Sequence, residues 1–181
     1  GDFWSARVQP HPWGFIFEWL FLVLLYVFIS PLSGLHWLAT LLTGIISHVP
    51  GPVTSFQLEM SGEPFLPWDI THVRDFAGAA GPDELDIQPT MLWTLAMFLV
   101  FVAASCFLRM PYRKETRWRW RIGSAAVSGF LWCLLVFGVY LNASMCEFFG
   151  IYSDMWMQDR YYKNYGVITG FMTNLQVLDI E

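Results

Sequence analysis

The stretch that decides the fold is residues 122–146, IGSAAVSGFLWCLLVFGVYLNASMC, which contains no charged residue over twenty-five positions. About 20 apolar residues in a helix cross the hydrocarbon core of a bilayer. The stretch therefore predicts a membrane-spanning helix, which we place at residues 122–144. Its first third is rich in Gly, Ala and Ser, small residues that allow a second helix to approach closely.

The rest of the chain agrees with a membrane protein. Its 181 residues are 55% hydrophobic and 18% aromatic, and only 14% are charged, whereas about a quarter of the residues of a soluble domain are charged. Three further apolar runs predict spans at residues 13–30, 35–54 and 91–108. Two prolines and a glycine interrupt the run 35–54, which is either a broken span or a re-entrant segment.

The charges predict how the chain is oriented. Residues 109–121, RMPYRKETRWRWR, carry six of the ten basic residues of the chain. A basic run with tryptophans is also typical of a nucleic-acid patch, but two flanking spans favour a cytoplasmic loop, and we expect no nucleic-acid partner. The polar segment 55–90, with seven acidic residues and only Arg74 as a base, then lies outside the cell. The C-terminus lies outside too.

The predicted fold class is thus an all-α membrane protein. A bundle of about four transmembrane helices occupies residues 1–146, with an extracellular polar loop at 55–90. Residues 147–181 lack a long apolar run, and we predict an extracellular linker there, with an interfacial helix and a turn at Gly166 and Gly170. The chain begins with Gly1 and has no basic segment before its first apolar run, so we expect it to be part of a longer polypeptide.

The polar segment opens on residues 61–70, SGEPFLPWDI, a candidate functional motif. Its prolines exclude a regular helix and restrict the chain before it folds. We predict that the motif is ordered and packs against the outer end of the bundle, the simpler alternative being a surface loop with an interfacial Trp. Its candidate residues are Glu63, Pro64, Pro67, Trp68 and Asp69.

Two carboxylates of the chain have competing interpretations. Asp69 precedes a possible short helix, and we favour a capping role toward the amides of Thr71 and His72 over contact with a headgroup or a metal. Glu18 is the one Asp, Glu, Lys or Arg residue inside a predicted span. Such residues are often functional, although Glu18 is near enough to the start of its run to reach the interface.

The sequence contains no recognisable catalytic or metal-binding constellation. Its four histidines are scattered, and Cys106, Cys133 and Cys146 lie in or at the end of apolar runs without a CxxC spacing, as small buried hydrophobic residues do. No nucleophile motif, phosphate loop or HExxH sequence is present. We therefore predict no catalytic residue, no metal site and no cofactor within this chain.

Two stretches resemble a known family. GEPFLPWDI (62–70) is similar to the G-x-P-x-x-P-x-D element of lipoteichoic acid synthase-type proteins, and RYYKNYGVITGFMTNL (160–175) is similar to the segment that joins their last span to their catalytic domain. The resemblance covers about residues 13–178. The linker residues that carry it are Tyr161, Tyr162, Lys163, Asn164, Gly166, Gly170 and Phe171.

The resemblance implies a bacterial, multi-pass cell-membrane protein. Members of this family have five spans and then an extracellular sulfatase-like domain, in which a divalent metal, typically manganese, and a threonine transfer glycerol phosphate from phosphatidylglycerol. This chain would supply the membrane module, with four of the spans and without that domain. Its expected partners are membrane lipids, with phosphatidylglycerol as a candidate, and the catalytic domain. The membrane part of a phosphoethanolamine transferase and a non-enzymatic scaffold or transporter fragment are the alternatives.

Overall fold

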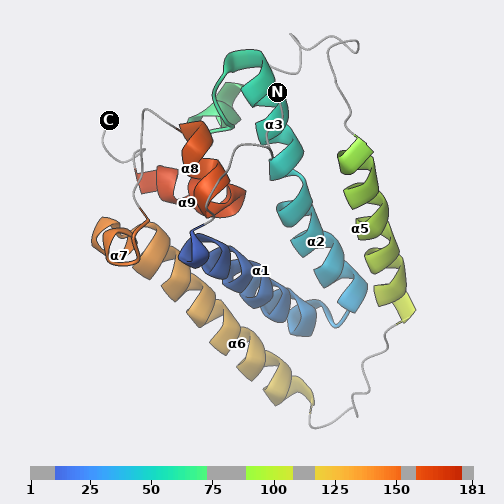
Figure 1. Ribbon diagram of the computed structural model, residues 1–181. Coiled ribbons are helices and arrows are strands. Elements are labelled where there is room, and N and C mark those ends of the chain that lie inside the picture. Colours follow the sequence, from blue (N-terminus) through green and yellow to red (C-terminus); the bar gives the residue numbers. More distant parts are fainter. Residues whose placement is uncertain (1–10, 73–88, 108–116, 152–157, 177–181) are drawn as a thin grey trace.

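A computed structural model describes residues 11–72, 89–107, 117–151 and 158–176 of the chain. Every regular element in these ranges is a helix, as predicted (Figure 1). The elements are α1 (Pro12–Ser33), α2 (His36–His48), α3 (Pro50–Ser61), the 3-10 helix η1 (Pro67–His72), α5 (Pro89–Phe107), α6 (Arg117–Leu135), the π-helical turn η2 (Val136–Tyr140), α7 (Ala143–Phe148), α8 (Gln158–Tyr165) and α9 (Val167–Asn174).

Helices α1 and α6 form the central pair and run side by side in opposite directions (Figure 1). The small residues of α6 make this packing possible, as the sequence predicts. Ala125 and Ser128 are buried, and a Cβ at Gly129 would come within 2.9 Å of the Phe28 ring. The apolar side chains on the outer faces of this pair, such as Trp19 and Phe130, are largely exposed.

Within the described residues, two helices are long and apolar enough to cross a membrane: Pro12–Ser33 and the continuous stretch Trp118–Tyr140 formed by α6 and η2. The apolar part of α5, Met91–Phe107, and helix α2, at 13 residues, are shorter. The four-span bundle therefore remains a prediction.

Helices α2 and α3 together make the second arm of the structure, alongside α5 (Figure 1). They meet at Val49, where Pro50 starts the new helix, so the predicted break in the run 35–54 is present. Gly44 of α2 lies against the ring of Phe98 of α5. Helix α3 continues to Ser61, seven residues into the segment expected to be loop, because its two prolines lie in its first turn, where no backbone donor is lost.

The end of α1 is fixed to the start of α6 through one side chain. Arg121 donates from Nε to the carbonyl oxygen of Pro31 at 2.7 Å, and from a terminal nitrogen to that of Leu32 at 3.2 Å. Gly34 then ends α1 with a φ of 69°, so the expected turn at Pro31–Gly34 begins only after Ser33. A cation at the carbonyl end of a helix also complements the helix dipole.

The C-terminal end of α6 differs from the predicted boundary at residue 144. The helix widens into the π-helical turn η2 and stops at Tyr140, and Asn142 begins the separate helix α7 by accepting a bond from the amide of Met145 at 3.3 Å. An asparagine is a favoured helix N-cap, which explains why a new helix starts here although the sequence stays uncharged.

The tail differs most from the sequence-based expectation. The predicted helix and turn correspond to a hairpin of two short helices, α8 and α9, which packs against the ends of α1, α3 and η2, and the interfacial location stays a prediction. The expected turn is present at Gly166, with a φ of 91°, but Gly170 lies inside α9. The side chains of Tyr162, Thr169 and Asn174 are almost completely buried, so this hairpin is part of the core.

Several predicted features lie outside the described residues. These are most of the basic loop, residues 108–116, the acidic part of the polar segment, residues 73–88, and the two ends of the chain.

Candidate functional site

The two motifs that carry the family resemblance meet at one end of the bundle. After Gly62 ends α3 with a φ of 78°, the segment turns back, and Pro64, Leu66 and Pro67 become buried. The ring of Phe65 lies parallel to that of Phe171 in α9, with centroids 6.2 Å apart. Motif 62–70 is therefore an ordered element, as predicted, and the linker motif forms its packing surface.

The remaining motif residues have distinct surroundings. Glu63 is exposed at the turn, and Trp68 is partly buried and packs against the core cluster. That cluster joins residues from α1, the motif, α6, η2, α7, α8 and α9 and the residue Ile151 after α7: Phe17, Phe21, Leu66, Leu135, Val136, Tyr140, Cys146, Ile151, Tyr161, Tyr162 and Ile168.

Asp69 has a structural role that differs in detail from the predicted cap. One oxygen of its carboxylate accepts from the backbone amide of Leu66 at 2.8 Å and from the side-chain amide of Gln57 in α3 at 2.7 Å. Asp69 is thus the third residue of η1 and reaches back to the residue before the helix, the second half of a capping box. We expected the Asp69 carboxylate to accept from amides that follow it, toward Thr71 and His72, but both described bonds come from residues that precede it in the sequence.

Tyr162 connects the two motifs directly. Its hydroxyl donates to the carbonyl oxygen of Phe65 at 3.0 Å and accepts from the side-chain amide of Asn174 at 3.4 Å. A Cβ at Gly170 would lie 2.9 Å from the Tyr162 ring, so the close packing of α8 on α9 requires a glycine there. Burial raises the pKa of the Tyr162 phenol above its ordinary value, so the hydroxyl keeps its proton for Phe65.

Glu18 forms a bond that links α1 to the hairpin. Its carboxylate accepts from the backbone amide of Ile168 at 3.1 Å, in the first turn of α9. The residue before α9 is Gly166, which has no side chain to cap the helix, and a Cβ there would collide with the Glu18 carboxylate. Glu18 therefore caps α9 from 150 positions away, a use of the carboxylate that neither sequence-based interpretation included.

The other linker residues help to hold the hairpin. Lys163 pairs with Asp159 one turn earlier at 3.7 Å, and the carbonyl oxygen of Asn164 accepts from the amide of His11 at 2.8 Å. Tyr161 is buried and bonds to the hydroxyl of Thr173 at 2.6 Å.

Sequence analysis missed the buried polar residues that complete this site. Thr169 donates to the carbonyl oxygen of Gly14, and the amide groups of Gln158 and Asn174 bond to each other at 3.0 and 3.5 Å. The spacing of Thr169 and Thr173 along α9 places them on one face of the helix, which could have indicated a polar contact surface.

The described groups of the site make structural contacts. In the described part of the chain, no group of three or more His, Cys, Asp and Glu residues is arranged to hold a metal ion. Burial raises the pKa of the Cys146 thiol, which favours the protonated, unreactive form. The described groups at this end of the bundle mostly bond to one another, and they fix the hairpin to α1 and to motif 62–70.

Comparisons with protein-family models, with curated proteins and with solved structures each found no match to the chain.

Proposed function

We propose that this chain is the membrane-anchoring module of a lipoteichoic acid synthase-like enzyme, which transfers glycerol phosphate from phosphatidylglycerol at the outer face of a bacterial cell membrane. The α8–α9 hairpin would serve as the rigid joint between the helices and an extracellular catalytic domain. A divalent metal, manganese in this family, would belong to that domain.

The observation that carries the proposal is the contact between the two motifs. Phe65 and Tyr162 are 97 positions apart, yet they bond directly, and Phe65 also stacks on Phe171. The two stretches that resemble the family thus form one structural unit. A chance resemblance of two unrelated segments gives no reason for such an association.

The distribution of polar groups supports the proposed orientation. Arg119, Arg121 and two exposed tryptophans lie at the start of α6, close to the end of α1. The motifs and the hairpin lie at the opposite end of α1, which is about 30 Å away for 22 helical residues at about 1.5 Å each. The end with Arg119 and Arg121 adjoins the basic loop of the sequence, whereas Lys163 at the motif end is paired with Asp159, and this distribution agrees with a cytoplasmic loop and an outer site.

Labelling of single cysteines on intact cells tests this topology. With a membrane-impermeant maleimide, we expect a cysteine at Thr116 to stay unlabelled and one at Ala79 to react, because basic loops beside spans remain in the cytoplasm. Permeabilised cells provide the control, since both positions should then react. Reaction at Thr116 and protection at Ala79 on intact cells would reverse the orientation and remove the basis of the proposal.

Activity measurements test the enzymatic part. Purified residues 1–181 should not release diacylglycerol from phosphatidylglycerol, because a phosphoryl transfer needs an activated nucleophile or a metal. The protein encoded by the full reading frame should release it when supplied with manganese. Turnover by residues 1–181 alone would reveal a catalytic site within this chain.

The protein encoded by the full reading frame also distinguishes the proposed enzyme from the two alternatives. A phosphoethanolamine transferase would act on phosphatidylethanolamine and leave phosphatidylglycerol unchanged. A scaffold or transporter fragment would be followed by no metal-dependent phosphatase-like domain.

A further inference from the structure

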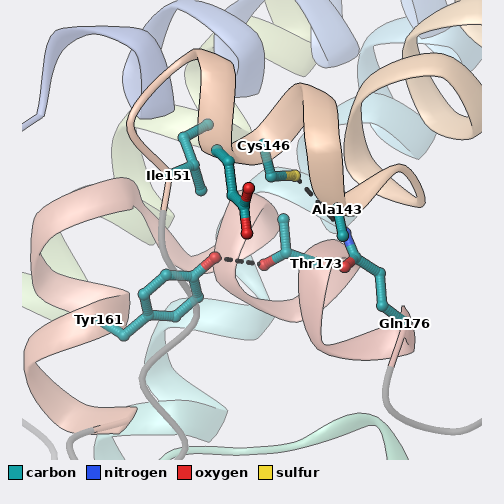
Figure 2. A pocket seen from close by; sticks show the side chains of 7 residues that line it. Ala143, Cys146, Ile151, Tyr161, Thr173 and Gln176 are labelled. Carbon is teal, nitrogen blue, oxygen red and sulfur yellow. Dashed lines mark hydrogen bonds between the residues drawn. The ribbon is translucent and has the colours of Figure 1, made fainter. Parts of the chain in front are cut away.

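A small polar cavity lies beside the hairpin, at the outer end of the α6–η2 stretch (Figure 2). Its volume is about 130 Å³, several times the space that one water occupies, which is about 30 Å³. Its walls come from α7, α8, α9 and the residues that follow them. The lining residues are Ala143, Cys146, Glu147, Ile151, Tyr161, Thr173 and Gln176.

The two side-chain hydroxyl groups that line this cavity already donate their protons to hydrogen bonds. The Thr173 hydroxyl donates to the carbonyl oxygen of Thr169 at 2.8 Å, so in its 2.6 Å bond with Tyr161 it must be the acceptor (Figure 2). Tyr161 is then the donor, and burial, which raises its pKa, keeps the phenol protonated. The Tyr161 oxygen retains lone pairs that can accept.

The thiol and amide protons are used as well. Cys146 donates from Sγ to the carbonyl oxygen of Val139 at 3.1 Å. The Gln176 side-chain nitrogen donates to the carbonyl oxygen of Tyr140 and to Cys146 Sγ at 3.5 Å. Because a nitrogen must face the Tyr140 carbonyl, the orientation of the Gln176 amide is fixed, and its oxygen is left as an acceptor.

The cavity therefore offers acceptors and one negative charge. The acceptors are the Tyr161 oxygen, the Gln176 amide oxygen and the carboxylate of Glu147, whose side chain is exposed. None of the seven lining residues is Lys, Arg or His. A phosphate or carboxylate would meet the Glu147 charge without a compensating cation, whereas a group with several donors and a positive charge matches every remaining partner.

We propose that this cavity binds a primary ammonium group carried on a short alkyl chain. Three N–H donors of an ammonium match the three acceptors, and Ala143 and Ile151 provide apolar contact for the alkyl carbons. The ammonium could belong to a lipid headgroup of the outer leaflet or to a free amine. This site is independent of the proposed phosphoglycerol transfer, whose donor lipid carries no amine.

Thermal unfolding of the full chain in detergent micelles, with ethylammonium chloride as the probe, tests the proposal. The midpoint temperature of unfolding should rise by about 3 °C when the ethylammonium concentration is about ten times its Kd. Ethanol and glycerol test whether neutral hydroxyl groups suffice, phosphate tests an anion, and tetramethylammonium tests a cation that has no donors. An equal rise with glycerol, phosphate or tetramethylammonium would overturn the proposal.

Variants connect the effect to the cavity. Glu147→Gln removes the charge at an exposed position and should weaken ethylammonium binding by about tenfold or more. Ala143→Leu should abolish binding by filling the cavity, without removing a polar group. Asp159→Asn, which removes a nearby carboxylate that does not line the cavity, is the matched control and should bind like the native chain. Unchanged binding in both Glu147→Gln and Ala143→Leu would place the amine elsewhere and refute the site.

Bilayer nanodiscs distinguish the two sources of the amine. If a lipid headgroup is the ligand, phosphatidylethanolamine should stabilise the native chain more than phosphatidylcholine, and Ala143→Leu should remove the difference. If a free amine is the ligand, the two lipids should be equivalent and ethylammonium should still stabilise the chain in both.

Discussion

Replacing Gly166 with alanine is expected to lower the free energy of unfolding by about 3 kcal/mol or more. The residue has a φ of 91°, a conformation that costs a residue with a side chain about 1–3 kcal/mol. The new Cβ would also displace the Glu18 carboxylate from the first turn of α9, and a lost helix cap costs about 1 kcal/mol. Reversible unfolding in mixed detergent micelles, followed by circular dichroism, measures the change.

Gly123→Ala is the matched control for this variant. Gly123 lies in α6, and apart from its own neighbours and helix backbone no atom of the described residues lies within 4 Å of an added Cβ, so alanine should be neutral or should stabilise the helix by up to about 1 kcal/mol. The double variant Glu18→Ala with Gly166→Ala should be less destabilised than the sum of the single variants, because the collision is then absent. Additive effects would show that Glu18 and Gly166 do not interact and that α9 is capped in another way.

The sequence predicted the features that depend on local pattern. Uncharged stretches predicted the long helices, and the small residues of α6 predicted the face that packs on α1. The prolines of motif 62–70 predicted an ordered segment that is not a regular α-helix, and its second half forms the 3-10 helix η1. In each case a local property, such as hydropathy, side-chain volume or a fixed φ angle, limits the conformations that the segment can adopt.

The hairpin could not be predicted in the same way, because its contacts join distant residues. Its mixture of aromatic and charged residues is typical of an interfacial helix. Its burial depends on partners far away in the sequence, among them the carbonyl of Gly14, the carboxylate of Glu18 and the carbonyl of Phe65. Glu18 itself was unassigned for the same reason. Its partner is an amide 150 positions away, and backbone amides leave no signal in a sequence.

The direction of the Asp69 bond was missed for a more local reason. An aspartate near the start of a short helix can reach forward to free amides or back to the amide that precedes the helix, and both arrangements are helix caps. The presence of Gln57 on α3, which continues to Ser61, favours the backward arrangement, because the same oxygen can accept from both groups. The length of α3 was the missing information.

Asp69→Ala is the second substitution expected to have a large effect, because it would leave the Leu66 amide without its acceptor. Leu66 is only 3% exposed, so water cannot replace the bond easily. We expect a cost of about 2–3 kcal/mol, confined to motif 62–70 and its contact with the hairpin. Hydrogen exchange at the Leu66 amide should accelerate by about 30- to 150-fold.

Two further variants, one at Asp69 and one at Glu63, separate a structural role of Asp69 from a functional one. Asp69→Asn keeps an oxygen that can accept from both Leu66 and Gln57, so exchange at Leu66 should change little. Glu63→Gln changes the exposed carboxylate of the same motif and should alter stability by less than about 0.5 kcal/mol. If the proposed function holds, Asp69→Asn should retain the transfer activity of the proposed enzyme, whereas Asp69→Ala should lose it along with the order of the motif. If Asp69→Asn loses activity while the Leu66 amide stays protected, the charge itself is needed, and Asp69 contacts the substrate rather than only holding the motif in place.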